Sequence, residues 1–399
     1  MTTDTTRLLN APWDKITLSG LVEAAVARSP KQVFLRDCPR RLDWNGVEPR
    51  ELTFETFQRS ALFLAAQLRT LGVEPGDTVF LMLPNSVETP LALTATLMAG
   101  AVPAIAPADE KVDTLRAMAE RCGATAIVTM NRVGDILLGE KARQVAAKLM
   151  NIRCVAGFGF DLPDGIVSLE GWSEEDVMSL APREPRQDEP ALITFAREDG
   201  AICACRRSQA QLVAEMLLAT TLAAPTETGG IVSLMQPGSA ASLAAGFLLA
   251  LQTRVPLTLI GPYETPAVVE ALARQPGAVL LAPDHFAAGP AGQFAKQIST
   301  CLAIAHIAVA HATGPGASIL KPGAVSGPLI VEFEERGLAA LPEWPRQGKL
   351  TLGGSFAHPL ADLIPGGQVY LGFEDGAVTG FGAAEILRRT KEASAGKAA

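Results

Sequence analysis

Residues 52–107 read LTFETFQRSALFLAAQLRTLGVEPGDTVFLMLPNSVETPLALTATLMAGAVPAIAP, and two helix patterns alternate in them with two strand patterns. The spacing of apolar residues predicts a helix over 52–71. The residues that form its apolar stripe are Phe54, Phe57, Ala61, Leu64, Ala65, Leu68 and Leu71. The turn GVEPGD leads into the continuous apolar strand 78–83, which is typical of a parallel sheet covered on both faces. A helix over 87–98 and a strand over 101–106 follow.

The same alternation continues beyond this stretch and then starts again. A helix is predicted over 111–122 and a strand over 125–129. The polar, proline-rich stretch 181–190 is typical of a linker. The elements predicted after it are strand 192–195, helix 209–222, strand 230–235, helix 239–251, strand 256–260, helix 266–273 and strand 278–282. Repeated strand–helix–strand units form open parallel sheets with helices on both faces.

We therefore expect an α/β fold of two flavodoxin-like α/β subdomains packed together, with a small, rudimentary antiparallel β subdomain. The first α/β subdomain is expected over residues 1–190 and the second over 191–340. After residue 341 glycine and proline become frequent and apolar runs shorten, so a short β appendage is expected over 341–385. Residues 386–399 are expected to fray.

The composition suits a layered α/β protein and excludes several other classes. The chain has 399 residues, of which 48% are hydrophobic and 5% aromatic, enough for two or three packed units. Its net charge is −8 with scattered basic residues, so we expect no nucleic-acid partner. The amino terminus lacks a secretory signal pattern, and the longest apolar run, Ala240–Leu251, is too short to span a membrane. We expect a cytoplasmic protein with no membrane partner, whose six cysteines form no disulfides.

Residues 191–212, ALITFAREDGAICACRRSQAQL, predict a strand, a loop and a helix that starts at Ser208. Phosphate-binding loops occupy such positions, and they need several glycines, hydroxyl groups and usually a lysine. Here Gly200 is the single glycine of the loop, and the carboxylates of Glu198 and Asp199 would repel a triphosphate. The sequence therefore predicts a loop without phosphate-binding chemistry.

The block 52–107 resembles the N-terminal part of the adenylate-forming superfamily, which includes acyl- and aryl-CoA synthetases, peptide-synthetase adenylation domains and luciferases. The resemblance rests on a helix, the turn GVEPGD, a strand ending in LPNS and a helix ending in LMAGAVPAIAP, and it extends from about Leu21 to Phe381. These segments are scaffold, so they imply the fold more strongly than the activity.

The resemblance also implies where the family's ligand-binding residues would fall. The Thr/Ser/Gly-rich loop of the family, which ends in Pro-Lys-Gly, corresponds to AREDGAICACRRS, where Gly200 alone matches. The position of a pocket histidine is taken by Gly238 or Ser239. A ribose-binding aspartate and a catalytic lysine of the family would lie beyond Phe381, so we expect no catalytic residue and no unaided acyl-adenylate formation.

The family's Tyr-Gly-x-Thr-Glu segment, which lines the adenine and Mg²⁺ sites, corresponds to residues 333–337. Phe333 takes the place of the tyrosine and can still stack on a purine. A shift of one or two residues would bring Glu334 or Glu335 to the position of the family's glutamate.

Three arginines, Arg197, Arg206 and Arg207, flank the predicted helix start and could hold an anion there. We favour the alternative that they are solvated loop charges paired with neighbouring acidic residues. Ser208 and Gln211 form the pattern of a capping box, which we prefer to a nucleophilic role because no histidine lies near in the sequence. The cysteine and histidine spacings predict no metal site.

Three functions remain open at this stage. The favoured one is a catalytically degenerate ligase relative, a pseudoenzyme that binds an acyl, aryl or nucleotide small molecule, or a partner protein, where the two sheets meet. The second is a working AMP-forming acyl or aryl ligase that uses ATP, AMP and Mg²⁺, with a C-terminal domain supplied in trans. The third is a structural assembly subunit, for example a homo-oligomer. The candidate ligand-binding residues are Arg197, Gly200, Arg206, Arg207, Ser208, Gly238, Ser239, Phe333, Glu334 and Glu335.

Overall fold

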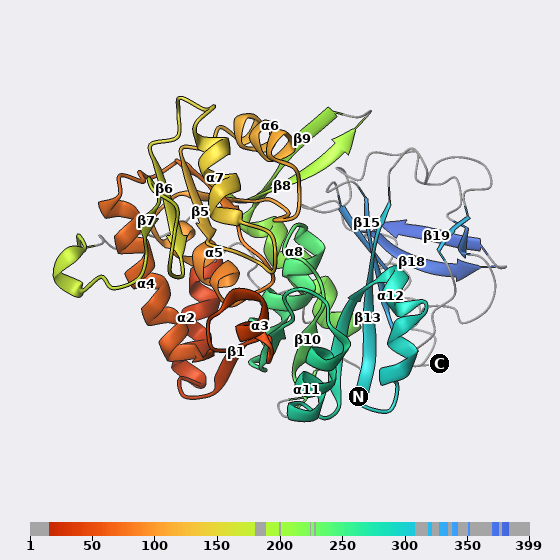
Figure 1. The fold of residues 1–399 in the computed structure, drawn as a ribbon. Coiled ribbons are helices and arrows are strands. Elements are labelled where there is room, and N and C mark those ends of the chain that lie inside the picture. Colours follow the sequence, from red (N-terminus) through yellow and green to blue (C-terminus); the bar gives the residue numbers. More distant parts are fainter. Residues whose placement is uncertain are drawn as a thin grey trace.

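The computed structural model describes residues 16–179, 189–198, 201–223, 225–226, 229–307, 318–320, 327–333, 337–341, 350–351, 369–374 and 377–382. Within these residues two parallel-rich sheets and their covering helices form a mixed α/β fold (Figure 1). The predicted fold class is confirmed.

The first sheet has the strand order β7-β6-β5-β3-β4-β8-β9 in the described part of the chain. Its strands are parallel except for β9, which runs antiparallel to β8. The bounds are β3 Thr78–Met82, β4 Val102–Ile105, β5 Ala126–Met130, β6 Cys154–Phe158, β7 Val167–Ser168, β8 Pro190–Glu198 and β9 Ala201–Ser208.

Helices cover both faces of this sheet, as the uninterrupted apolar strand pattern predicted. The helices are α4 Phe54–Thr70, α5 Glu88–Met98, α6 Val112–Cys122 and α7 Leu138–Ala146. In β3, Val79 and Leu81 pack in the core that includes α4 and α5, whereas Phe80 and Met82 pack with residues of α6 and α7. Every residue of β3 is buried, because side chains of a strand alternate between two covered faces.

The second sheet has the order β19-β18-β16-β15-β13-β12-β10-β11-β1-β2 among the described strands. The strands from β1 to β15 in this order are parallel, and β2, β16 and β19 each pair antiparallel with a neighbour. The bounds are β1 Val33–Asp37, β2 Glu51–Thr53, β10 Ile231–Ser233, β11 Leu257–Leu259, β12 Ala278–Pro283, β13 Ile298–Ile307, β15 Leu329–Phe333, β16 Gly337–Leu341, β18 Val369–Glu374 and β19 Ala377–Gly382. Two short strands, β14 Ser318–Leu320 and β17 Leu350–Thr351, pair separately.

Sheet membership does not follow the order of the chain. Strands β8 and β9 come after residue 188 but belong to the first sheet, while β1 and β2 come early and belong to the second. The alternation of strands and helices predicts the elements but not their partners, because parallel partners are often remote in sequence. Strands β18 and β19 form an antiparallel hairpin that extends the second sheet beside β16. The subdomain boundaries stay a prediction.

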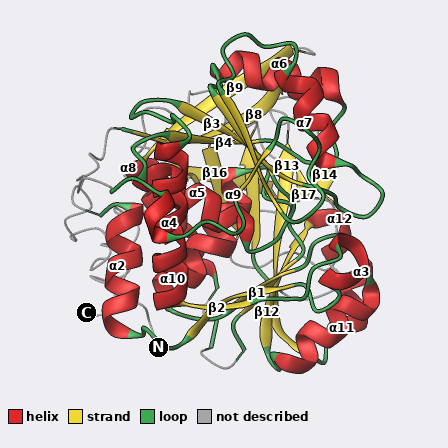
Figure 2. Ribbon diagram, turned by 60° about the vertical axis from the view of Figure 1, so that its left-hand side comes forward, coloured by secondary structure: helices red, strands yellow, loops and turns green. Residues whose placement is uncertain are grey.

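The remaining helices lie around the second sheet and between the two sheets. They are α2 Leu18–Arg28, α3 Arg41–Asn45, α8 Gln209–Leu222, α9 Ala240–Leu243, a π-helical segment Ala244–Leu248, α10 Leu249–Thr253, α11 Thr265–Arg274 and α12 Asp284–Ala287, with 3₁₀ turns at Glu174–Asp176 and Pro290–Phe294. Figure 2 shows α2, α4, α5 and α10 side by side, and these helices are in contact.

An aromatic cluster joins helix α4 to the second sheet. The ring of Phe34, on β1, stacks on Phe54 with centroids 4.5 Å apart and meets Phe57 edge-on at 5.1 Å. Phe247, from the π-helical segment, lies 5.8 Å from Phe34 and 5.9 Å from Phe57. Four large rings packed in this way stabilise the contact between elements that lie far apart in the sequence.

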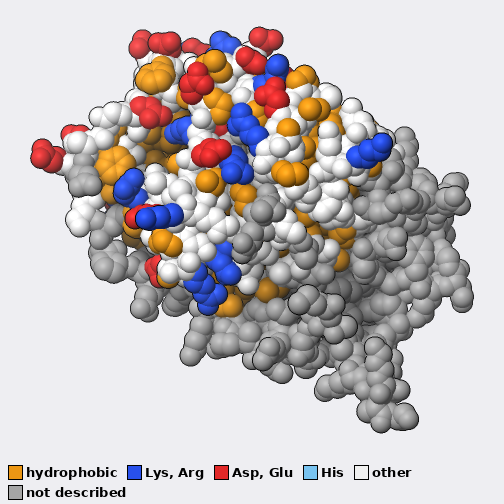
Figure 3. Space-filling view, turned by 90° about the horizontal axis from the view of Figure 1, so that it is seen from below, with side chains coloured by type: hydrophobic (Ala, Val, Ile, Leu, Met, Phe, Trp, Pro, Cys, Tyr) orange, Lys and Arg blue, Asp and Glu red, His pale blue; other side chains and the backbone are white. Residues whose placement is uncertain are grey.

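The described surface carries mixed charges. On the face shown in Figure 3, Lys and Arg side chains are interspersed with Asp and Glu side chains. In the part of the chain that the structure describes, no helix combines the length and the apolar character needed to cross a membrane.

Candidate functional site

The segment expected to be a phosphate-type loop is a β-hairpin. Strands β8 and β9 pair antiparallel, with Phe195 opposite Ala204 and Glu198 opposite Ala201. The prediction of a loop was wrong for residues 201–208, because AICACRRS pairs with β8 in the strand ladder instead of leaving the sheet. Arg197 lies in β8 opposite Ile202, while its side chain and Gly200 lie outside the described part of the structure.

Arg207, at the end of β9, is buried and bonded to residues from three other elements. Its Nε donates to Glu215 Oε1 on α8 at 2.9 Å, and its Nη1 donates to Thr194 Oγ1 on β8 at 2.8 Å. Its Nη2 lies 3.7 Å from Glu332 Oε1 on β15. Only 4% of Arg207 is exposed. The favoured interpretation of Arg207 as a solvated loop charge was therefore wrong: it is an internal ion pair between the two sheets.

The two carboxylates around Arg207 are also buried. Burial raises the pKa of Glu215, the nearby Arg207 opposes this shift, and Glu332 adds to it through like-charge repulsion. Glu332 is 1% exposed and also accepts a long hydrogen bond of 3.4 Å from the backbone N–H of Ala241, in the first turn of α9. One guanidinium therefore faces two carboxylates, so no excess positive charge is left in this cluster for an anion.

Glu215 and Glu332 were not among the residues predicted from sequence. Each is a single acid within an apolar run, LVAEMLL on α8 and LIVEF on β15, and that pattern is the signal that could have identified them. Phe333, the next residue along, lies in β15, but its side chain is outside the described set. The predicted residues Glu334 and Glu335 also lie outside the described residues.

Ser208 caps helix α8, as the capping-box pattern predicted. Its Oγ accepts from the backbone N–H of Gln211 at 3.3 Å, and its own N–H donates to Gln211 Oε1 at 2.8 Å. This reciprocal pair satisfies two backbone N–H groups near the helix start. The neighbouring Arg206 is exposed, and its Nη2 donates to the carbonyl of Cys122 at 3.4 Å.

Gly238 and Ser239 lie where the two sheets meet. Ser239 caps α9, since its Oγ accepts from the N–H of Ser242 at 3.1 Å. A Cβ at Gly238 would lie 3.3 Å from Cγ of Pro107, which follows β4 of the first sheet, so the backbone runs close to that sheet. Arg207 of β9, Ser239 at the start of α9 and Glu332 of β15 are thus brought close together, whereas nothing titratable stands at Gly238 or Ser239.

The segment LPNS links the two sheets through Asn85. Its Nδ2 donates to the carbonyl of Ser233 at 2.9 Å and to the carbonyl of Ile260 at 2.8 Å, at the ends of β10 and β11. Asn85 is 4% exposed. A side-chain amide with two donors can satisfy two buried carbonyls at once, so this residue fastens the first sheet to the second.

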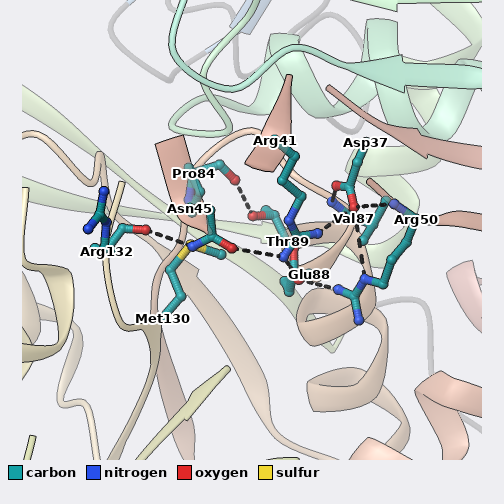
Figure 4. Close-up of polar contacts among 10 residues, drawn as sticks. All are labelled: Asp37, Arg41, Asn45, Arg50, Pro84, Val87, Glu88, Thr89, Met130 and Arg132. Carbon is teal, nitrogen blue, oxygen red and sulfur yellow. Dashed lines mark hydrogen bonds and ion pairs between the residues drawn. The ribbon is translucent and has the colours of Figure 1, made fainter. Parts of the chain in front are cut away.

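A buried ion-pair cluster next to this link joins β1, α3 and α5 (Figure 4). Arg41 lies 2.5 Å from Glu88 and also pairs with Asp37, while Arg50 pairs with Glu88 from the partly exposed side. Burial alone would raise the pKa of Glu88, but Arg50 and Arg41 outweigh it and hold that pKa below its usual range. Asp37 accepts the backbone N–H of Val87 at 3.1 Å. The cluster positions the start of α5.

Part of the chain is similar to a known protein family. Residues 22–196 match the family model described as AMP-binding enzyme. The chain is 32% identical over 138 residues to the salicyl-AMP ligase / salicyl-S-ArCP synthetase of Mycobacterium tuberculosis, a stretch that covers 35% of this chain and 23% of that protein.

Solved structures share the fold at low sequence identity. The apo structure of Mycobacterium smegmatis MbtA has a TM-score of 0.61 at 20% identity over 75% of this chain and 54% of its own length. The anthranilate CoA ligase AuaEII, in complex with anthranoyl-AMP, has a TM-score of 0.63 at 13% identity over 73% of this chain and 55% of its own. The chain thus spans about half the length of these structures.

A small cavity lies among described residues where the two sheets meet. Its volume is about 20 Å³, and its lining includes Asn85, Ser233, Met235, Gly246 and Phe247. Such a volume holds about one water molecule. In the described part of the chain, no group of three or more His, Cys, Asp or Glu side chains is placed to bind a metal ion.

Proposed function

We propose that this chain is a non-catalytic relative of the AMP-forming acyl and aryl acid ligases, which keeps their AMP-binding scaffold and acts by binding a small molecule or a partner protein. The observation that carries the proposal is the environment of Arg207. Its guanidinium is buried and bonded to Glu215 and Thr194, with Glu332 as a second nearby carboxylate. A phosphate-binding guanidinium must present free N–H groups to the anion, whereas here the protein's own carboxylates take that place.

The hairpin β8–β9 supports the same proposal. Phosphate loops hold their ligand with backbone N–H groups that are free to point at it, and in this hairpin the paired strands use those groups in a sheet ladder. The match to the AMP-binding family ends at Ala196, within β8. Loss of a single preorganised donor typically costs roughly 10²–10³-fold in turnover, so loss of the whole loop would leave little catalysis.

The relatives suggest which ligands to test first. One relative is named for salicyl-AMP and one solved neighbour holds anthranoyl-AMP, so aryl acids, AMP and aryl adenylates form the first set. The junction cavity of about 20 Å³ is too small for an aryl ring. An aryl ring could enter this cavity only if lining side chains such as Phe247 or Met235 changed rotamer.

The decisive experiment is pyrophosphate release from ATP and Mg²⁺, with a panel of aryl and acyl acids and the full chain at high concentration. The salicyl-AMP ligase with salicylate serves as the positive control. We expect no release above that of the assay without protein. Acid-dependent release that follows the concentration of this chain would overturn the proposal. Thermal unfolding with AMP, CoA and each acid then tests binding, because a ligand of the native state raises the melting temperature.

One observation favours the alternative of a working ligase. Arg206 is exposed at the end of β9, and among the described residues its Nη2 makes one long hydrogen bond of 3.4 Å, to the carbonyl of Cys122, so it could turn toward a phosphate. That alternative predicts that the chain binds ATP·Mg²⁺ and that Arg206→Ala weakens this binding. It also predicts turnover when a separate C-terminal adenylation domain is added. Light scattering on the purified chain separates both ideas from an assembly role, which requires an oligomer.

A further inference from the structure

We propose that a pocket on the outer side of helix α4 binds a small aromatic carboxylate. The pocket lies between α4, the end of β6 and the segment that follows β7, which are neighbours on the left of Figure 1. Its volume is about 480 Å³, within the range of roughly 300–1,000 Å³ that is typical of small-molecule sites. No residue of its lining takes part in the Arg207 cluster or in the junction cavity, so it is independent of the function proposed above.

The walls of the pocket are apolar and aromatic. Leu64 and Leu169 are buried beneath it, Phe158 closes the side at the end of β6, and the rings of Phe63 and Trp172 are half-buried. Aromatic side chains favour flat ligands, since rings stack or meet edge to face. The apolar part of the ligand is therefore a flat ring system.

Hydrogen bonds hold these walls in place. Gln67 Nε2, on α4, donates to the carbonyl of Leu169 at 3.0 Å, and the N–H of Leu169 donates to the carbonyl of Gly157 at 2.9 Å. Trp172 Nε1 donates to the carbonyl of Ser168 at 2.7 Å, which fixes the indole and satisfies its polar atom. A pocket whose walls are already positioned loses less entropy when a ligand binds.

The charges of the lining favour an anion. Arg59 is exposed on α4 and has no ion-pair partner among the residues that the structure describes. Arg50 also lines the pocket; its Nη2 pairs with Glu88, and its Nε lies 3.9 Å from the nearest oxygen of Asp37. Glu170 is the one acidic residue of the lining. A carboxylate can thus pair with Arg59, with Arg50 nearby, while its ring covers the apolar wall.

The test is isothermal titration calorimetry of the full chain with 2-naphthoate and with its uncharged counterpart 2-naphthalenemethanol. We expect the acid to bind at least about tenfold more tightly than the alcohol, because hydrogen bonds to charged groups are the stronger ones. Arg59→Ala should weaken binding of the acid by about tenfold, and Arg59→Lys should restore part of the loss. Ser60→Trp, which fills the pocket from α4, should abolish binding.

Arg116→Ala is the matched control, because Arg116 is a half-exposed arginine on α6, which covers the opposite face of the first sheet. It should leave the affinity for 2-naphthoate unchanged, and saturating AMP should also leave it unchanged. Equal affinity for acid and alcohol, no binding at millimolar acid, equal effects of Arg59→Ala and Arg116→Ala, or displacement by AMP would each overturn the proposal.

Discussion

Arg207 donates to Glu215 at 2.9 Å and lies 3.7 Å from Glu332, in a part of the protein that water hardly reaches. Removing one partner of a buried ion pair leaves a charge without compensation, which costs about 3–5 kcal/mol. We expect Arg207→Ala to lower the free energy of unfolding by about that amount, measured by urea denaturation.

The neighbouring arginine gives the control for this variant. Arg206 is exposed, so Arg206→Ala should change the free energy of unfolding by less than about 0.5 kcal/mol. If Arg207→Ala lowered the free energy of unfolding as little as Arg206→Ala, the two buried carboxylates would not depend on Arg207. The environment of Arg207 would then no longer support the proposed function.

Glu215 makes stability depend on pH in a particular direction. Its pKa in the folded protein is raised above the ordinary value of 4.5, chiefly by burial. A carboxyl group whose pKa is raised in the folded state stabilises the protein fully below about pH 4.5. This contribution to the free energy of unfolding is lost as the pH rises through the folded-state pKa. Relative to Glu215→Gln, the native protein should therefore lose stability as the pH rises above about 4.5, as measured by unfolding at a series of pH values. A relative gain with rising pH would mean that Arg207 outweighs burial and lowers this pKa.

At the level of one helix, the start of α8 depends on Ser208. The Oγ of Ser208 accepts the N–H of Gln211 at 3.3 Å and the Gln211 side chain returns the bond at 2.8 Å. Loss of such a cap costs about 1 kcal/mol, so Ser208→Ala should lower the free energy of unfolding by about that amount in a urea titration. Ser208→Thr keeps the hydroxyl and should stay close to the native value. Equal losses for both variants would show that packing rather than capping explains the effect.

The hairpin β8–β9 was not predicted because its sequence contains two conflicting patterns, one typical of a loop and one typical of a strand. The acidic and glycine-containing stretch after Phe195 is typical of a turn or loop, and it outweighed the alternation in Ile202, Cys203, Ala204 and Cys205, which is typical of a strand. The pairing of β9 with β8, and the contact of β9 with α6, stabilise the strand in the folded protein. Contacts with other elements thus overrode the local preference.

At the scale of the molecule, Asn85 is the most specific link between the two sheets. Removing its amide leaves the buried carbonyl of Ile260 without this donor, whereas the carbonyl of Ser233 still accepts the N–H of Ile260 at 3.0 Å. A buried carbonyl left unsatisfied costs about 1–3 kcal/mol. We expect Asn85→Ala to lower the free energy of unfolding by about 1–3 kcal/mol, measured by urea denaturation.

Asn45 supplies the control for Asn85. It donates at 2.9 Å to the carbonyl of Arg132 in an exposed setting, where water can replace the bond, so Asn45→Ala should cost less than about 1 kcal/mol. Asn85→Asp keeps the shape of the side chain but not the donors, and it should be at least as harmful as Asn85→Ala. Native-like stability of Asn85→Asp would show that the two carbonyls find other donors.

Local pattern was sufficient for most of the elements and for the fold class. The apolar stripe predicted the helix now seen at Phe54–Thr70, and the uninterrupted run predicted the buried strand Thr78–Met82, because each depends on the periodicity of neighbouring residues. The capping of α8 by Ser208 was predictable for the same reason, since both partners lie within one turn.

Contacts between remote residues could not be obtained in this way. The burial of Arg207 depends on Glu332, on a strand more than a hundred positions later in the chain, and the place of β1 in the second sheet depends on β11. The sequence around an arginine is the same whether its guanidinium faces solvent or a carboxylate. Its charge partners, exposure and pKa environment arise when distant elements pack together, so the folded structure alone assigns them.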